Sequence, residues 1–90
     1  MAMKYRELER LVRGFSNHRR IQVLEFLWTN PELSVSELSK MLKVEYKTLA
    51  VHVSRLALAG LVMKRNDGND VRHKVSTRGQ SVLKFLRTLA

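Results

Sequence analysis

The side chains with the most evident chemistry in this chain are basic, and they gather in its C-terminal half. Of the 90 residues, 17 are Lys or Arg and 8 are Asp or Glu, giving a formal net charge of +9. Residues 46–90 hold nine basic and two acidic groups, whereas residues 21–45 hold two basic and four acidic ones. An excess of this size is typical of proteins that bind a polyanion, so nucleic acid is the first partner to consider.

Groups for catalysis or metal binding are sparse. The chain has no cysteine, which excludes disulfides, thiolate metal sites and a catalytic thiol. Its histidines, His18, His52 and His73, are not spaced as a metal-binding pair. The sequence contains no glycine-rich phosphate loop, no nucleophile elbow and no carboxylate pair at catalytic spacing. We therefore expect a protein that is not an enzyme and that uses no cofactor and no metal.

Length and composition predict one ordered domain over residues 1–90. A chain of 90 residues with 44% hydrophobic residues, one Pro and four Gly can fold around a single core. No apolar stretch is long enough to span a membrane, and the N-terminal segment is too basic and interrupted to be a signal peptide. We expect a cytoplasmic, nucleoid-associated protein without a membrane partner.

Hydrophobic periodicity predicts two helices in the first third of the chain. Apolar residues over 4–15 recur at helical spacing, and Gly14 is expected to end that helix. Asn17 is placed as the N-cap of a second helix, whose apolar residues surround most of its circumference. Asn30 and Pro31 are expected to end this helix, because proline disfavours helix in the residue before it.

Two closely spaced helices follow and form a helix-turn-helix. Ser34 and Glu37 form a capping box that opens a short third helix. A fourth helix is predicted over residues 45–59, with Gly60 as its stop. Its buried face is expected to contain Leu49, Val53 and Leu56.

A hairpin and a last helix complete the predicted domain. Residues 61–65 and 71–76 alternate in polarity around the turn-forming residues 66–70, which predicts a two-stranded ribbon. A capping box over residues 77–80 is expected to open the final helix. The predicted fold is therefore mainly α with a small β-hairpin, in the α-α-α-α-β-β-α order of a winged helix-turn-helix.

The helix over 45–59 is expected to be the DNA-reading element. In a helix-turn-helix, the second helix enters the major groove with its N-terminal half against the base edges. Lysine and arginine can contact guanine or phosphate, threonine can donate and accept, and valine can touch a thymine methyl. The residues predicted to reach DNA from this helix are Tyr46, Lys47, Thr48, Val51, His52 and Arg55.

The hairpin, or wing, over 61–76 adds a second basic surface. A basic wing beside a basic helix can lie on the adjacent phosphate backbone or in the minor groove. Its predicted DNA contacts are Lys64, Arg65, Arg72 and Lys74.

Several segments resemble the ArsR/SmtB type of winged-helix transcription regulator over about residues 15–76. They are Asn17–Leu24, Glu32–Leu38, Thr48–Leu56 and Ala59–Val62, while Thr77–Gly79 is similar to the MarR type. The resemblance implies a regulator that binds double-stranded DNA as a homodimer, through the first and last helices. The residues expected at the dimer contact are Tyr5, Leu8, Val12, Phe15, Val82, Phe85, Leu86 and Leu89.

The chain also departs from that family's pattern. Thiolate sensors of the family carry cysteines where this chain has Ser34 and Ser36, and residues 78–90 lack the ligands of the family's other metal site. Ala50 and Val51 replace a serine and a basic residue, which favours fewer or more apolar base contacts. Lys43 replaces a glycine, at a cost of roughly 1 kcal/mol if this position is left-handed.

Three functions are compatible with these patterns. The first is a dimeric, sequence-specific transcriptional regulator that represses by occluding a promoter, with a pseudo-palindromic site. The second is an architectural chromatin protein of low sequence specificity, whose binding would depend steeply on salt. The third is a winged-helix protein-interaction module of the transcription machinery, in which the apolar Val51 and Leu58 would contact another protein.

Overall fold

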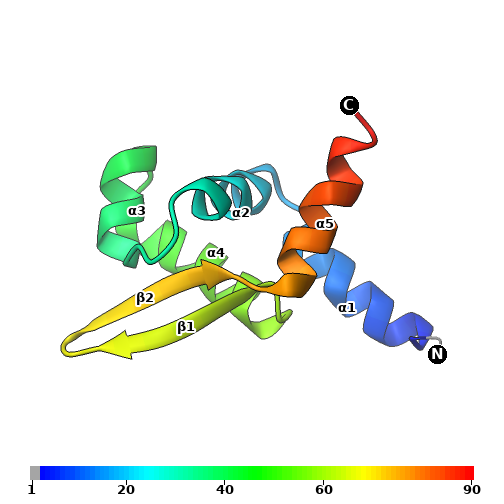
Figure 1. The fold of residues 1–90 in the computed structure, drawn as a ribbon, viewed down its shortest axis with the longest axis horizontal. Helices are drawn as coiled ribbons and strands as arrows, with labels where there is room; N and C mark the ends of the chain where they lie inside the picture. Colours follow the sequence, from blue (N-terminus) through cyan, green and yellow to red (C-terminus); the bar gives the residue numbers. More distant parts are fainter. Residues whose placement is uncertain (1–2) are drawn as a thin grey trace.

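A computed structural model describes residues 3–90, so the first two residues of the domain predicted over 1–90 lie outside the described residues. The elements are α1 (Tyr5–Phe15), α2 (His18–Thr29), α3 (Val35–Leu42), α4 (Tyr46–Leu58), β1 (Val62–Asp67), β2 (Asp70–Val75) and α5 (Thr77–Arg87). This order confirms the predicted winged helix-turn-helix (Figure 1). Between residues 3 and 90, no helix combines the length and apolar character needed to cross a membrane.

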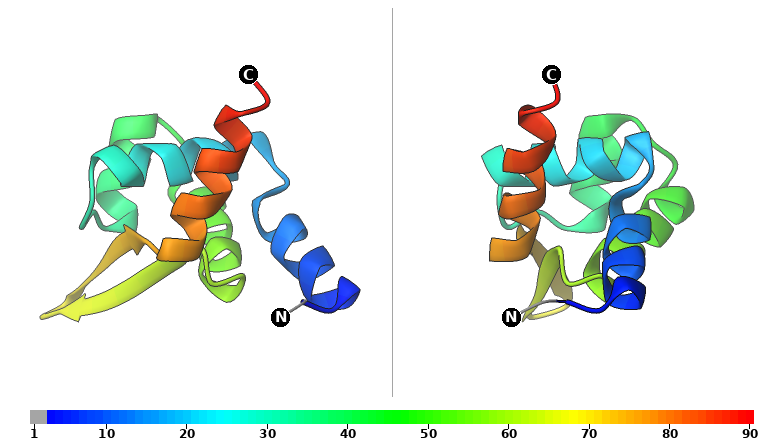
Figure 2. Two further views of the ribbon diagram at one scale, coloured as in Figure 1. Left: turned by 45° about the vertical axis from the view of Figure 1, so that its right-hand side comes forward. Right: turned by 90° about the vertical axis from the view of Figure 1, so that its right-hand side faces the viewer.

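The elements are arranged between two ends of an elongated molecule. α3 and the tip of the hairpin lie at one end, while α1, α5 and the C-terminus lie toward the other (Figures 1 and 2). α2 runs between the two ends and supplies Val23, Leu24 and Leu27 to the centre of the core, where all three are fully buried. This burial agrees with a helix whose apolar residues surround most of its circumference.

α1 continues through Gly14 to Phe15, so the prediction that Gly14 ends this helix is wrong. Gly14 is buried where α1 crosses the last turn of α4, and a Cβ at this position would lie 2.3 Å from the Cβ of Ala59. The glycine therefore serves close packing of two helices. It does not supply a left-handed helix end.

Local capping signals are confirmed at α2 and α3. Asn17 Oδ1 accepts from the backbone N–H groups of Arg19 and Arg20 at 2.9 and 3.2 Å. The Ser34 hydroxyl accepts from the Glu37 N–H at 3.1 Å, and the Glu37 carboxylate accepts from the Ser34 N–H at 2.9 Å. Each helix start is thus fixed by residues no more than three positions apart.

The cap of α5 lies one residue earlier than predicted, so the capping box over residues 77–80 is wrong. The Ser76 hydroxyl accepts from the Gly79 N–H at 3.0 Å and donates to the Gly60 carbonyl at 2.6 Å. Thr77 is already the first residue of the helix. Ser76 and Thr77 are adjacent hydroxyl residues, and either could cap the helix. The long-range hydrogen bond to Gly60 favours Ser76 as the cap.

The two turns that frame the helix-turn-helix and the wing use left-handed backbone. Lys43, between α3 and α4, has a φ of 56°. This left-handed conformation agrees with the expectation that Lys43 replaces a glycine of the family pattern. α4 ends before Gly60, which has a φ of 76° and is the predicted stop. In the hairpin, Asp67 pairs with Asp70, so only two residues form the turn and the strands extend into the predicted 66–70 loop.

Candidate nucleic-acid interface

The start of α4 is fixed by Glu45. Its carboxylate accepts from the backbone N–H groups of Lys47 at 2.7 Å and Thr48 at 3.2 Å. The same carboxylate accepts from the Thr48 hydroxyl at 3.1 Å. These hydrogen bonds, the one from Lys47 foremost, hold the pKa of Glu45 below its ordinary value. The N-terminal turn of α4 is therefore capped within the protein itself, with no partner needed.

One face of α4 is buried and the opposite face is open to solvent. Leu49, Val53 and Leu56 are buried in the core, as predicted. Lys47, Thr48 and Arg55 are exposed, together with half-exposed apolar groups, Tyr46 and Val51, at 54% each. The exposed face thus combines cations, a hydroxyl and apolar surface in the half of the helix that a helix-turn-helix directs at base edges.

His52 is the predicted contact that lies away from this exposed face. Its side chain is partly buried near the first turn of α2, and its Nδ1 has no hydrogen-bond partner within residues 3–90. Burial, followed by the nearby charges of Arg20, His18 and Arg19, lowers the pKa of His52. The neutral ring is therefore favoured, and it packs between two helices.

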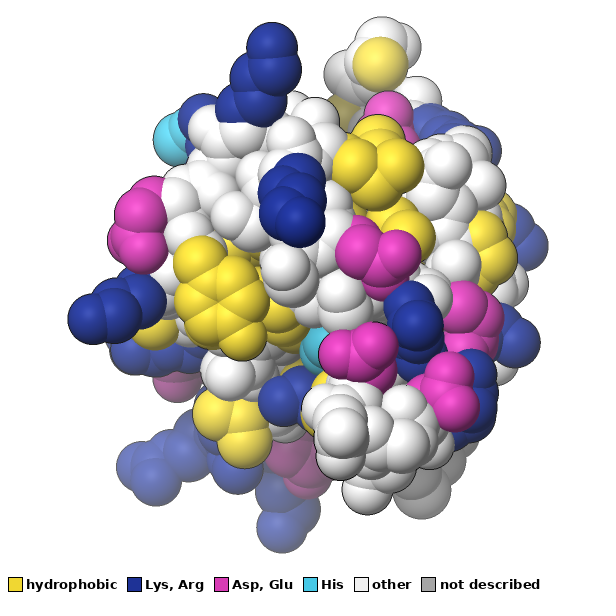
Figure 3. All heavy atoms as spheres, turned by 90° about the vertical axis from the view of Figure 1, so that its left-hand side faces the viewer, with side chains coloured by type: hydrophobic (Ala, Val, Ile, Leu, Met, Phe, Trp, Pro, Cys, Tyr) yellow, Lys and Arg dark blue, Asp and Glu magenta, His cyan; other side chains and the backbone are white. Residues whose placement is uncertain are grey.

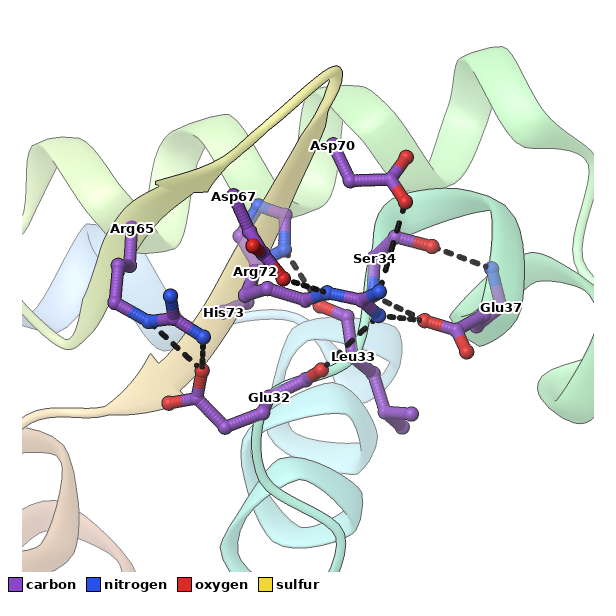
Figure 4. Close-up of polar contacts among 9 residues, drawn as sticks. All are labelled: Glu32, Leu33, Ser34, Glu37, Arg65, Asp67, Asp70, Arg72 and His73. Atoms are coloured by element: carbon purple, nitrogen blue, oxygen red, sulfur yellow. Dashed lines mark hydrogen bonds and ion pairs between the residues drawn. The ribbon is translucent and has the colours of Figure 1, made fainter.

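The two arginines of the wing are engaged by carboxylates. Arg65 donates from Nε and Nη2 to Glu32 Oε1 at 3.1 and 2.6 Å. Arg72 donates from Nη1 to Glu37 Oε1 at 2.6 Å, with Asp67 and Asp70 oxygens each 3.5 Å from its other nitrogens (Figure 4). The sequence prediction missed Glu32 and Glu37, because they lie 33 and 35 positions away from the arginines that they engage, Arg65 and Arg72.

The two lysines of the wing are exposed, and the ion pairs within residues 3–90 include neither. Lys64 lies opposite His73 in the strand register, while Lys74 lies opposite Met63 on the other face of the ribbon. Acidic and basic side chains stand next to each other at this end of the molecule (Figure 3). The free positive charge of the wing is therefore carried by lysine, with arginine charge largely compensated.

A hollow of about 400 Å³ lies between the wing and the N-terminal part of α4. Its lining includes Tyr46, Ser54, Lys64 and His73. His73 is only 2% exposed, and its Nδ1 lies 2.8 Å from the Leu33 carbonyl oxygen. Burial lowers the pKa of His73, with the Leu33 hydrogen bond acting in the opposite direction. The hollow is also lined by the start of α3, through Ser34 and Ser36, so it lies where the wing, α3 and α4 meet.

The apolar residues expected at a dimer contact divide into two groups. Tyr5, Leu8, Val12, Phe85 and Leu89 are exposed, with 90% exposure for Tyr5 and 67% for Leu89. The remaining three pack within the monomer: Val82 is buried, and Phe15 and Leu86 lie partly buried against the core. We call the five exposed residues the α1/α5 patch.

The serine positions that replace the family's cysteines are used structurally or exposed. Ser34 is buried as the cap of α3, and Ser36 is exposed in its first turn. Over residues 3–90, no group of three His, Asp or Glu side chains is arranged to hold a metal ion.

Comparison with known proteins identifies the family. The model of the MarR family matches residues 17–74. The transcriptional activator HlyU of Vibrio cholerae serotype O1 is 35% identical over 80 residues, which are 88% of this chain and 73% of the relative. The structure of HlyU from Vibrio cholerae N16961 has a TM-score of 0.81 at 31% identity, covering 99% of this chain and 97% of that chain.

Two further structures share the fold. An ArsR-like transcriptional regulator from Rhodococcus sp. RHA1 has a TM-score of 0.75 at 29% identity, covering 94% of this chain and 77% of that chain. The homodimeric winged helix-turn-helix DNA-binding domain Mb0332 of Mycobacterium bovis has a TM-score of 0.84 at 18% identity, covering 99% of this chain and 89% of that chain.

These matches confirm the resemblance that the sequence motifs indicated. The relatives are named as transcriptional regulators and not as enzymes. The family match includes α2, α3, α4, β1 and most of β2, which form the helix-turn-helix and its wing. The chain therefore belongs to the MarR family of winged-helix transcriptional regulators and is a homologue of HlyU.

Proposed function

We propose that this protein binds double-stranded DNA sequence-specifically as a homodimer, with α4 in the major groove and the wing on the flanking phosphate backbone. The observation that supports this most is the exposed face of α4, where Lys47, Thr48, Val51 and Arg55 lie on a helix that Glu45 caps. Such a face offers hydrogen bonds to base edges and an apolar contact for a thymine methyl. A helix that is already formed and capped avoids the entropy cost of ordering a segment on binding.

Within this proposal the cationic residues have different roles. Lys47 and Arg55 act on base edges or adjacent phosphates from the major groove, and Tyr46 borders the groove at the first turn of α4. Lys64 and Lys74 act on the backbone from the wing, because their charges are free of the carboxylates that engage Arg65 and Arg72. Phosphate contacts position the domain, whereas contacts from α4 supply the sequence preference.

The homodimer is supported by the α1/α5 patch. The two helices that carry its residues, α1 and α5, lie toward the end of the molecule opposite the hairpin tip (Figure 2), so pairing through them leaves the wing accessible. The fold is one that in Mycobacterium bovis Mb0332 forms a homodimeric DNA-binding domain. Two copies related by a two-fold axis would read two half-sites, about one turn of DNA apart.

A small dimer bound across a promoter blocks access of RNA polymerase, so repression at the nucleoid is the mode of action that we propose. The Vibrio cholerae relative is named as an activator. Transcription in vitro from a promoter that carries the bound site measures the sign directly: added protein should lower transcript yield, and a rise would establish activation.

Selection of bound sequences from a random pool of duplex DNA tests the proposal. The expected result is one enriched motif with two-fold related halves. Binding without an enriched motif, with a steep salt dependence, would instead indicate an architectural chromatin protein. Absence of DNA binding at physiological salt would favour a protein-interaction module, in which Val51 and the 86%-exposed Leu58 contact another protein.

A further inference from the structure

The wing is fastened to the segment that precedes α3 by backbone hydrogen bonds. The Glu32 N–H donates to the His73 carbonyl at 2.8 Å, and the His73 N–H donates to the Leu33 carbonyl at 3.0 Å. These bonds add a short bridge to the free edge of β2, so the ribbon does not extend from the domain on its own two strands alone. Glu32 adopts a left-handed φ of 67° at this connection.

Side chains close the same junction. Arg65 pairs with Glu32, and Arg72 lies among Glu37, Asp67 and Asp70, as Figure 4 shows. Arg72 Nη1 also donates to the Glu32 backbone carbonyl at 3.4 Å, so all three guanidinium nitrogens of Arg72 lie beside an oxygen. Four carboxylates surround two guanidinium groups, and the cluster carries two more negative charges than positive ones.

One carboxylate oxygen connects the wing to the start of the helix-turn-helix. Glu37 Oε1 accepts from the Ser34 N–H, which is half of the α3 capping box, and from Arg72 Nη1 at 2.6 Å. The Arg72 side chain is 25% exposed, less than any of its acidic partners. A guanidinium held in this way is poorly placed to leave its partners for a phosphate, since it would leave an uncompensated acidic cluster facing DNA.

We propose that Arg72 is a positioning residue, which latches the wing to the capped start of α3 and makes no DNA phosphate contact. This inference rests on the proposed DNA-binding function. The latch sets the angle between the wing and α4 across the hollow that lies between them. The exposed Asp67 and Asp70 flank the hairpin tip and disfavour its insertion between the phosphates of a minor groove. Phosphate contacts of the wing therefore fall to Lys64 and Lys74.

The chain offers a matched pair of variants for the test, Arg72→Gln and Lys74→Gln. Both remove one positive charge from the same face of β2, two residues apart. Amide hydrogen exchange of the free protein reports the latch without DNA. Arg72→Gln should accelerate exchange of the Glu32 and His73 amides roughly two- to fivefold, while the amides of α2 keep their protection. Lys74→Gln should leave the exchange rates of the Glu32 and His73 amides and of the α2 amides unchanged.

Binding to one fixed duplex distinguishes a latch from a phosphate contact. Lys74→Gln should reduce the slope of log K against log salt concentration by roughly 0.9. Glu37→Gln keeps an acceptor oxygen for the cap but removes a partner charge of Arg72. It should accelerate exchange as Arg72→Gln does and weaken DNA binding, although the protein becomes more positive. Glu25→Gln is the control for the change in net charge. Glu25 is exposed on α2 and forms no ion pair within residues 3–90, so this variant measures how far the loss of one negative charge alone strengthens DNA binding.

The inference is overturned if Arg72→Gln leaves exchange unchanged and lowers the salt slope as Lys74→Gln does. Tighter binding by Glu37→Gln than by Glu25→Gln, with unchanged exchange, would also overturn it, because freeing Arg72 would then have supplied a phosphate contact. Arg72→Lys should restore part of the exchange protection. If the unaltered protein binds no DNA, the proposed function fails, and the exchange measurements still decide whether the latch exists.

Discussion

Two histidines, the buried His73 and the partly buried His52, lie in surroundings that disfavour their charged form. His52 lies near Arg20, and His73 lies near Lys64, with burial the main cause of the lowered pKa at both. A histidine whose pKa is lower in the folded state binds a proton more readily when unfolded. The stability that each neutral ring contributes is therefore present above the unfolded pKa of about 6.5 and is lost as the pH falls through the folded value.

We predict that the free energy of unfolding decreases on acidification from pH 8 to pH 5.5. Urea denaturation at a series of pH values measures it. A His52→Gln, His73→Gln double variant should have a flatter profile over this interval, whatever its stability at pH 8. An equally steep profile in the variant would contradict the assignment of this pH dependence to the His52 and His73 rings.

At the residue scale, sequence alone predicted those features that neighbouring positions decide. The Asn17 cap and the Ser34–Glu37 box depend on spacings of two or three residues, and both are confirmed. The choice between Ser76 and Thr77 could not be predicted, because the Gly60 carbonyl that selects Ser76 comes from another part of the chain. Glu37, which engages Arg72 from 35 positions away, was missed for the same reason.

At the scale of elements, glycine sets how closely α5 approaches the wing. Gly79 is buried in the first turn of α5, and a Cβ there would lie 2.3 Å from the Leu61 carbonyl oxygen and 2.6 Å from Val75 Cγ1. No small side-chain rotation relieves a contact with a backbone oxygen. A shift of α5 relative to β1 and β2 would be required.

Gly79→Ala is therefore predicted to lower the free energy of unfolding by about 3 kcal/mol, at the upper end of ordinary overpacking. Gly68→Ala is the matched control, since a Cβ at the hairpin tip meets nothing within 4 Å and only the φ of 64° is unfavourable. It should cost about 1 kcal/mol. Urea denaturation of both variants provides the comparison, and equal losses would show that packing of α5 on the wing tolerates a side chain.

The element order could be predicted because each helix and strand carries its own periodicity and stop signals. The lengths of the strands could not be predicted in this way. Residues 66–70 all suit a turn, yet pairing of Asp67 with Asp70 continues the strands to a two-residue connection. Gly14 was misassigned because a glycine near a helix end has the same sequence signature whether it ends the helix or admits a neighbour.

At the scale of the whole molecule, the α1/α5 patch is the surface that bears most on assembly. The end with α3 and the hairpin tip shows acidic, basic and apolar side chains side by side (Figure 3), and α1 also exposes charged residues such as Arg6 and Glu9 beside the apolar members of the patch. Exposed apolar patches of this kind mark protein interaction sites more often than they remain in solvent. The exposure of the patch residues was not predictable from the sequence, because the same periodic pattern describes residues that join the core, such as Val82.

Charge introduced into the α1/α5 patch should dissociate the dimer. We predict that a Phe85→Glu, Leu89→Glu double variant sediments as a monomer of about 10.5 kDa, whereas the unaltered chain sediments at about twice that mass. Met41→Glu is the control, because Met41 is 54% exposed on α3, toward the opposite end. A dimeric double variant, or a monomeric control, would place the subunit contact elsewhere.

The central claim is that the exposed face of α4 reads DNA sequence, and the ratio of affinities for the selected duplex and a scrambled duplex measures this most directly. Lys47→Ala with Arg55→Ala should bring that ratio close to one. Lys4→Ala with Arg6→Ala, an equal loss of charge near the N-terminus, should leave the ratio within about threefold of its original value. Equal losses of discrimination in the two double variants would contradict the claim.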